Sequence, residues 1–205
     1  MRSIFEVIDE APDSAGPDLV SLDDLKAALG ITGFSEDAAL EAAITFHSRI
    51  IADYCGRRFG LADALETFTF DRYEIWPVRQ ALTLSLYPVV EVSEFTTLGA
   101  GGQYGFDPAS GRLWSESGCL QGEVSVVYSG GYDLPEAAPA RLQMAVIHAV
   151  NEGRVSGSRD PSIREVQHGD TRISYFTSAT TSASSGFLSA TVMDLVKPYR
   201  RLHVA

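Results

Sequence analysis

The fold is decided by the stretch from Ser35 to Phe59, which reads SEDAALEAAITFHSRIIADYCGRRF. This stretch predicts one helix of about twenty residues. Ser35 is a favourable N-cap, and the two acidic residues after it lie in the first turn, where the helix dipole stabilises negative charge. Gly56 falls where a left-handed residue ends a helix.

Apolar residues cover an unusually wide part of this predicted helix. One face carries Leu40, Ala43, Ile44, Ile51, Tyr54 and Cys55. A second set, which widens the stripe beyond a single seam, consists of Ala39, Ala42, Phe46 and Ile50. A helix with so much apolar surface is either deeply buried or touches two partners, one of which could be another chain.

Composition describes a soluble globular protein with one ordinary core. The chain has 205 residues, of which 45% are hydrophobic and 21% are charged. A formal net charge of −11 argues against broad electrostatic attraction to nucleic acid or to an anionic membrane. No apolar run approaches the roughly twenty residues of a membrane span, and the acidic N-terminal segment is no signal peptide. Cys55 and Cys119 form neither a disulfide framework nor a zinc motif, so we expect synthesis in a reducing cytoplasm.

Two segments precede the long helix. Residues 1–20 predict an N-terminal arm, because Pro12, Gly16 and Pro17 break it, and its few apolar residues could dock on a neighbour. Ser21 then opens a short helix that Gly30 closes, with Asp24 at the capping-box position.

After Phe59 the hydrophobic period changes from 3.6 to 2, which predicts strands. The expected strands are Thr67–Tyr73, Leu82–Leu86, a segment starting at Val90, the hairpin 106–114 and Glu123–Tyr128. Phe95 is out of phase with its neighbours, which indicates a bulge or a sheet edge. The connections are too short for crossover helices, so the sheet is expected to be mostly antiparallel.

The remainder of the chain alternates between helices and short strands. A third helix is expected from Pro135 or Pro139 to Gly153. Further on, the pattern predicts a hairpin 163–176 around Gly169-Asp170, a Ser/Thr-rich linker 177–186, a last short helix 187–196 and a basic tail 197–205. The predicted class is therefore α+β: a small helical bundle of three main helices plus a C-terminal helix, with an inserted mostly antiparallel β-region and a β-hairpin. The predicted boundaries are 1–20 for the arm, 21–176 for the helical domain with its β-insertion at about 64–130, 177–186 for the linker and 187–205 for the C-terminal helix and tail.

No catalytic, cofactor or metal site is predicted. The four histidines are scattered over different elements, and none has a cysteine or carboxylate at ligand spacing. Cys55 could act as a nucleophile beside a histidine, but a small apolar residue on a buried helix face explains it better. The glycine-rich segment 99–102 lacks the lysine and the helix of a phosphate-binding loop.

Two basic clusters remain. Arg57 and Arg58 follow the long helix, where they are as easily a solvated helix end as an inter-chain ion pair. Tyr199, Arg200 and Arg201 lie beyond a helix and a linker, which is typical of a docking peptide whose tether raises its effective concentration at a partner.

The order of these segments resembles a known family, the head–tail connector (adaptor or head-completion) proteins of long-tailed bacteriophages, prophages and gene transfer agents. The resembling pieces are VSLDDLKAALGI, ADYCGRRFG, PVRQALTLSLYPVVEV, YGFDPASGRLW, VVYSGGYDLPEAAPARLQMAV, EVQHGDTRISY and LVKPYRR. They span residues 18–202, and their order carries the resemblance. The linker 177–186 and the N-terminal arm depart from the pattern.

The resemblance implies a structural virion protein at the neck. It implies a ring of about twelve copies that binds beneath the portal, extends the channel for packaged and ejected double-stranded DNA and offers a surface to the next neck or tail protein. Portal docking is implied for Phe187, Leu188, Met193, Leu195, Val196, Tyr199, Arg200 and Arg201. Subunit contacts are implied for Phe46, Ile50, Arg57, Arg58, Met144 and Ile147, and a channel- or stopper-facing hairpin for His168, Gly169 and Asp170. Three other classes stay open: a stopper or tail terminator of the same particle, a small enzyme that uses Cys55 or a histidine, and a bacterial regulatory binding module.

Overall fold

The computed structural model describes residues 2–10, 18–70, 81–97, 104–116, 120, 122–157, 165–168, 171–174 and 188–201. The chain divides into two compact units. The helical unit comprises Leu19–Cys55 and Pro139–Arg200, and the β unit comprises Met1–Asp18, Gly56–Ala138 and Arg201–Ala205. The expected α+β class, with a β-region inserted into a helical bundle, is confirmed.

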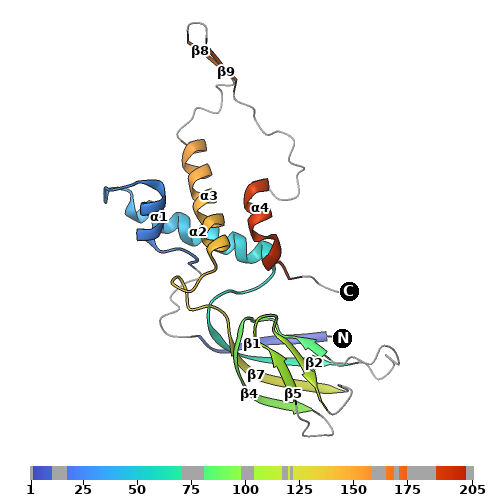
Figure 1. Ribbon diagram of the computed structural model, residues 1–205. Coiled ribbons are helices and arrows are strands. Elements are labelled where there is room, and N and C mark those ends of the chain that lie inside the picture. The colour runs from blue at the N-terminus through green and yellow to red at the C-terminus, as the bar shows by residue number, and fades with distance from the viewer. Residues whose placement is uncertain are drawn as a thin grey trace. The chain divides into compact units, whose positions relative to one another are not determined.

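The helical unit contains four helices, one short 3-10 turn and one hairpin among the described residues. They are α1 (Leu22–Leu29), α2 (Asp37–Cys55), α3 (Ala140–Gly157), α4 (Ala190–Val196), η1 (Lys197–Tyr199), β8 (Glu165–His168) and β9 (Thr171–Ser174). Figure 1 shows α3 against both α2 and α4, and these are the main helix contacts of the unit. The inner face of α3 consists of Leu142, Ala145, Val146 and Ala149, which are all buried.

Local chemistry fixes the helix ends. The Oγ of Ser21 accepts a hydrogen bond from the Asp24 N–H at 3.1 Å, so the predicted cap of α1 is confirmed. Gly30 and Gly56 have φ of 68° and 63°, the left-handed geometry expected after α1 and α2.

Two predicted helix ends were wrong. The third helix begins after Pro139, as one alternative had it, but it continues past Gly153 to Gly157. A glycine inside a helix costs only about 1 kcal/mol relative to alanine, which tertiary packing can offset. The last helix begins at Ala190, because the Ser189 side chain accepts a hydrogen bond from the Val192 N–H and caps it there.

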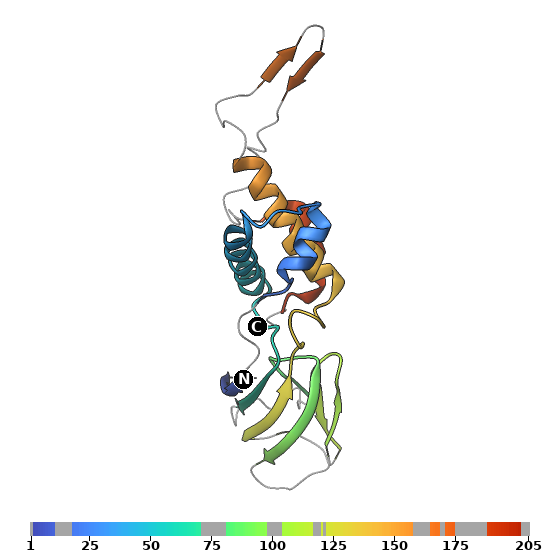
Figure 2. The same cartoon turned by 90° about the vertical axis from the view of Figure 1, so that its left-hand side faces the viewer.

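Within its described residues, the β unit contains a four-stranded sheet in the order β1-β2-β7-β4 and a three-stranded sheet in the order β3-β6-β5. The strands are β1 (Arg2–Glu10), β2 (Ala62–Thr69), β3 (Ala81–Thr83), β4 (Val89–Thr97), β5 (Tyr104–Asp107), β6 (Arg112–Ser115) and β7 (Glu123–Gly130). Every strand pair is antiparallel, as expected. Figure 2 shows β7 and β4 side by side. The predicted bulge near Phe95 is confirmed, since the β4–β7 register shifts between Val92 and Glu94 and β4 is an edge strand.

The first ten residues differ from the expected free arm. Arg2–Glu10 pairs with β2 and forms the other edge of the larger sheet. Phe5 and Val7 pack against the core of the β unit, which explains why this segment joins the sheet. Pro12, Gly16 and Pro17 lie outside the described residues.

The expected strand Leu82–Leu86 is shorter in the structure. Regular pairing ends at Thr83, although Leu82, Leu84 and Leu86 are all buried. The N–H groups of Ser85 and Leu86 bind side chains of Glu66 and Tyr128 in place of a neighbouring strand. The alternating pattern therefore predicted correctly which side chains are buried, but it did not predict where the backbone stops pairing with a neighbouring strand.

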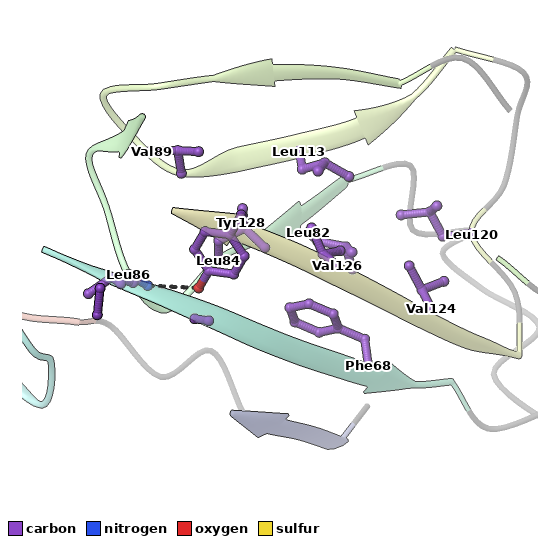
Figure 3. Packing of buried hydrophobic residues seen from close by; sticks show 12 residues of the cluster. Phe68, Leu82, Leu84, Leu86, Val89, Leu113, Leu120, Val124, Val126 and Tyr128 are labelled. Atoms are coloured by element: carbon purple, nitrogen blue, oxygen red, sulfur yellow. Dashed lines mark hydrogen bonds between the residues drawn. The ribbon is translucent and has the colours of Figure 1, made fainter. Parts of the chain in front are cut away.

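The core of the β unit lies between the two sheets. Figure 3 shows Phe68 of β2 and Val124, Val126 and Tyr128 of β7 facing Leu82 and Leu113 of the smaller sheet. Val124, Val126 and Tyr128 lie on the same face of β7, and all three side chains are fully buried.

Candidate assembly surfaces

The outer faces of α2 and α3 carry apolar side chains that are about half exposed in the described part of the chain. Phe46 of α2 is 52% exposed and Met144 of α3 is 48% exposed, while Ala39 and Ala42 are also exposed. The opposite face of α2 is filled, since Leu40, Ile44, Ile51 and Cys55 are buried. The wide apolar stripe read from the sequence is thus divided into a core face and a solvent face. Ile50 and Ile147, also expected in subunit contacts, are half-buried.

His47 lies beside this exposed face. Its ring meets the Phe46 ring edge-on, with centroids 5.2 Å apart. Its Nδ1 is buried and has no hydrogen-bond partner among the described residues. Burial lowers the pKa of His47 below its usual 6.5, and the nearby Glu152 carboxylate only partly opposes this shift.

We expect the lowered pKa to make the helical unit less stable in mild acid. The unfolded chain binds a proton at His47 near pH 6.5, but the folded chain resists it, so the free energy of unfolding falls as pH drops below about 6.5. His47→Gln should flatten that slope between about pH 7 and pH 5 when unfolding by urea is followed. His148→Gln, at an exposed position of α3, is the matched control. An unchanged slope in the His47 variant would contradict the expectation.

Arg57 and Arg58 occupy different environments. The Arg57 side chain is buried in the β unit, with its guanidinium 3.4 Å from the centre of the Tyr87 ring and 5.0 Å from that of Phe59. It also donates a hydrogen bond to the Tyr87 carbonyl. The expectation of a solvated or inter-chain arginine was wrong for Arg57, because two aromatic faces enclose it. Arg58 is exposed, as a subunit contact requires.

The C-terminal segment divides into core and surface residues. Leu188, Val192 and Val196 are buried, and the Cys55 thiol lies 3.8 Å from the Val196 carbonyl oxygen, to which it donates. Leu188 and Val196 are therefore core residues in this structure, which corrects their expected role in docking. Phe187 lies outside the described residues.

Several residues of the same segment remain accessible. Met193, Leu195 and Tyr199 are half-buried and Arg200 is exposed. The Arg200 guanidinium lies 5.5 Å from the centre of the Tyr54 ring. Arg201 reaches the buried carboxylate of Glu66, with Nη2 3.8 Å from Oε1.

Glu66 is a buried charge that the sequence pattern did not single out. Its side chain is 0% exposed, and it accepts hydrogen bonds from the Ser85 N–H at 2.8 Å, the Ser85 hydroxyl at 2.5 Å and the Tyr128 hydroxyl at 3.0 Å. Tyr128 in turn accepts a hydrogen bond from the Leu86 N–H, drawn in Figure 3. The sequence did contain one signal for its burial. Side chains two residues apart in a strand lie on the same face, so Glu66 lies on the same face of β2 as Ala64 and Phe68. Burial, followed by the neighbouring negative charge of Glu66, raises the pKa of Tyr128, which keeps its hydroxyl protonated as a donor.

We expect Tyr128→Phe to destabilise the β unit by about 1–3 kcal/mol, because the change leaves the Leu86 N–H without its acceptor and removes one of the three donors to Glu66. Urea unfolding followed by circular dichroism measures the loss. Tyr104→Phe is the matched control, since its hydroxyl is only part-buried and makes a 3.4 Å bond to the Val92 carbonyl. Equal losses in the two variants would contradict a special role for the Glu66 network.

The expected hairpin is present, as β8 paired with β9, and residues 163–164 and 175–176 of the predicted strands lie outside the described residues. His168 of β8 pairs with Thr171 of β9 at its tip, and Gly169 and Asp170 lie outside the described residues.

One exposed aromatic residue was not singled out from the sequence. Phe34, in the loop before α2, is 83% exposed, and the ammonium group of Lys26 lies 4.5 Å from the centre of its ring. Lys26 is itself held by Asp37, with Nζ 2.8 Å from the carboxylate oxygen. A loop phenylalanine has no periodic neighbours, so the helical pattern could not assign it to a face.

Cys55 is a core residue, as its sequence context favoured. Within the described part of the chain no group of three or more His, Cys, Asp or Glu side chains is placed to hold a metal ion. In the same part of the chain, no helix combines the length and apolar character needed to span a membrane.

Solved structures supply the comparison for this architecture. A chain in the neck of an empty gene transfer agent particle, with C6 symmetry, matches with a TM-score of 0.56 and 18% identity. The alignment covers 98% of this chain and 97% of that one. This chain therefore shares its fold with that chain.

Two further structures agree with this match. A chain in the neck of a native gene transfer agent particle, with C12 symmetry, gives a TM-score of 0.52 at 16% identity. A chain in the virion of a native gene transfer agent gives 0.54 at 18% identity. Both alignments cover 98% of this chain and 97% of the other. No protein-family model and no curated protein matches the sequence.

Proposed function

We propose that this protein is a structural component of a virion neck, a ring-forming adaptor between the portal and the tail. The observation that carries the proposal is the exposed apolar face of α2 and α3. Phe46 and Met144 present large side chains to solvent from the helices that form the subunit core. A small subunit gains stability by covering such a face with another copy.

Cyclic assembly is the arrangement that best fits such a face. A ring uses a heterologous contact, in which one patch of each subunit covers a different patch of the next. The full-length likeness to chains in necks with C6 and C12 symmetry supports a ring of about twelve copies. The proposed contacts are Phe46, Ile50, Arg58, Met144 and Ile147.

We assign portal docking to the accessible part of the C-terminal segment. Met193, Leu195, Tyr199 and Arg200 are exposed or half-buried, and Arg201 is 26% exposed. A chain with a net charge of −11 concentrates three cations in this short segment, at Lys197, Arg200 and Arg201. These cations fit a partner surface of negative charge.

The same proposal places the ring around a channel for double-stranded DNA and assigns the hairpin with His168 to the channel or to the next neck protein. A chain with few cations lets DNA slide past, because little binding by counterion release is possible. Assembly in this role needs no cofactor and no chemical step.

Electron microscopy of the purified protein, alone and mixed with the portal of the same particle, tests the proposal. The expected result is a closed ring that stacks coaxially on the portal ring. A monomer that neither closes into rings nor binds the portal would overturn it. A ring that binds a tail tube but no portal would favour the tail-terminator alternative.

A further inference from the structure

The C-terminal tail is held by a built site in the β unit, at a position for which the docking role gives no reason. Glu66 lies in the middle of β2, and its side chain points to the core with Ala64 and Phe68. Three donors from Ser85 and Tyr128 fix both carboxylate oxygens. Arg201, at the last described position of the chain, places its guanidinium 3.8 Å from Oε1.

This arrangement binds a cation more strongly than an exposed ion pair does. A carboxylate without solvent contact loses its hydration, so a nearby positive charge is worth more to it than at the surface. The three hydrogen bonds hold the carboxylate in one orientation but leave its net charge in place. A guanidinium, which is always charged, suits the site.

We propose that Glu66 is a latch site for the guanidinium of Arg201, which holds the tail in the free subunit and which portal docking must open. In this proposal Glu66 and the portal compete for the tail. That competition rests on the proposed function, because the same tail residues are assigned to the portal. The latch itself is a property of the free chain. While it is closed, the fraction of subunits with an available tail is reduced, and the apparent affinity for the portal falls by that fraction.

Limited trypsin digestion of the free protein tests the latch without any portal. Cleavage after Arg200, followed by mass spectrometry, reports how often the tail leaves its site. Glu66→Gln keeps the size of the side chain but removes the charge. Its amide oxygen at the Oε2 position still accepts from the Ser85 N–H and the Tyr128 hydroxyl, and its amide nitrogen at the Oε1 position can donate to the Ser85 hydroxyl, which then accepts. We expect this variant to be cleaved about tenfold faster. A tenfold change corresponds to an interaction free energy between those typical of exposed and of buried ion pairs.

Three further variants distinguish loss of the latch from a simple loss of folding. Arg201→Gln removes the other partner and should speed cleavage after Arg200 to a similar extent. If the two residues act on each other, the double variant is cleaved no faster than either single one. Glu94→Gln, at an exposed position of β4, is the matched control and should match the wild type. Additive effects, or equal cleavage of Glu66→Gln and wild type, would overturn the latch.

A second measurement separates the latch from the proposed function. If both hold, Glu66→Gln binds the portal more tightly by the factor seen in cleavage. Faster cleavage without portal binding by either protein would retain the latch and remove the portal role. Faster cleavage with unchanged portal affinity would show that the tail opens without competing, and would overturn the regulatory part of the inference.

Discussion

Subunits that carry lysine at both Phe46 and Met144 are expected to remain monomeric under conditions in which the wild type forms rings. Both side chains are about half exposed in the isolated subunit, so lysine costs little in the folded monomer. In a ring the same lysines would be buried without a partner at every interface, which costs several kcal/mol for each contact. Because a closed ring repeats the same contact between every pair of neighbouring subunits, this free-energy cost is paid at each interface of the ring.

Sedimentation velocity and negative-stain microscopy measure this outcome. The matched control is Val90→Lys, which places the same charge at an exposed apolar position of β4. Unfolding by urea should give a midpoint close to that of wild type for all variants. Rings formed normally by the double variant would show that the helical face is not the contact.

Removal of residues 197–205 is expected to leave a folded subunit that no longer sediments with the portal. The deletion takes Arg201 from Glu66, but the three donors from Ser85 and Tyr128 remain on the carboxylate. The α4 residues that complete the helical core, Val192 and Val196, also remain. The loss should therefore appear in binding and only weakly in the unfolding transition.

A point variant makes this prediction sharper. Arg200→Glu reverses one exposed charge without shortening the chain and should weaken portal binding roughly tenfold, an effect that high salt reduces. Arg112→Glu makes the same change at an exposed position of β6 and should have no effect. Unchanged cosedimentation of both the deletion and Arg200→Glu would refute the docking role of the tail.

The presence of the helices and three of their caps could be predicted because these signals are local. Ser21, Gly30 and Gly56 act within one turn, and the buried stripes of α2 and α3 follow from a simple period. The Phe95 bulge could be predicted for the same reason, since a break in period-2 alternation is visible within a few residues.

The parts that could not be predicted depend on residues far apart in the chain. Arg2–Glu10 becomes a strand only because β2, more than fifty residues later, offers it an edge. Arg57 is enclosed by Tyr87, and Glu66 is buried with Ser85, Tyr128 and Arg201, through contacts that no spacing rule relates. A charged residue in a strand reads as solvent-facing unless its partners are known, so the latch site was invisible in the sequence.

The division of the chain into two units has a consequence for folding during translation. The helical unit draws α1 and α2 from before the main segment of the β unit, Gly56–Ala138, and α3 and α4 from after that segment. Its buried face stays incomplete until Val192 and Val196 have been translated, because these side chains fill its core. The β unit can close earlier, as soon as β7 has emerged to lie between β2 and β4. A nascent chain therefore carries an unfinished helical pair throughout most of its translation, and a prematurely terminated product has no complete subunit to contribute.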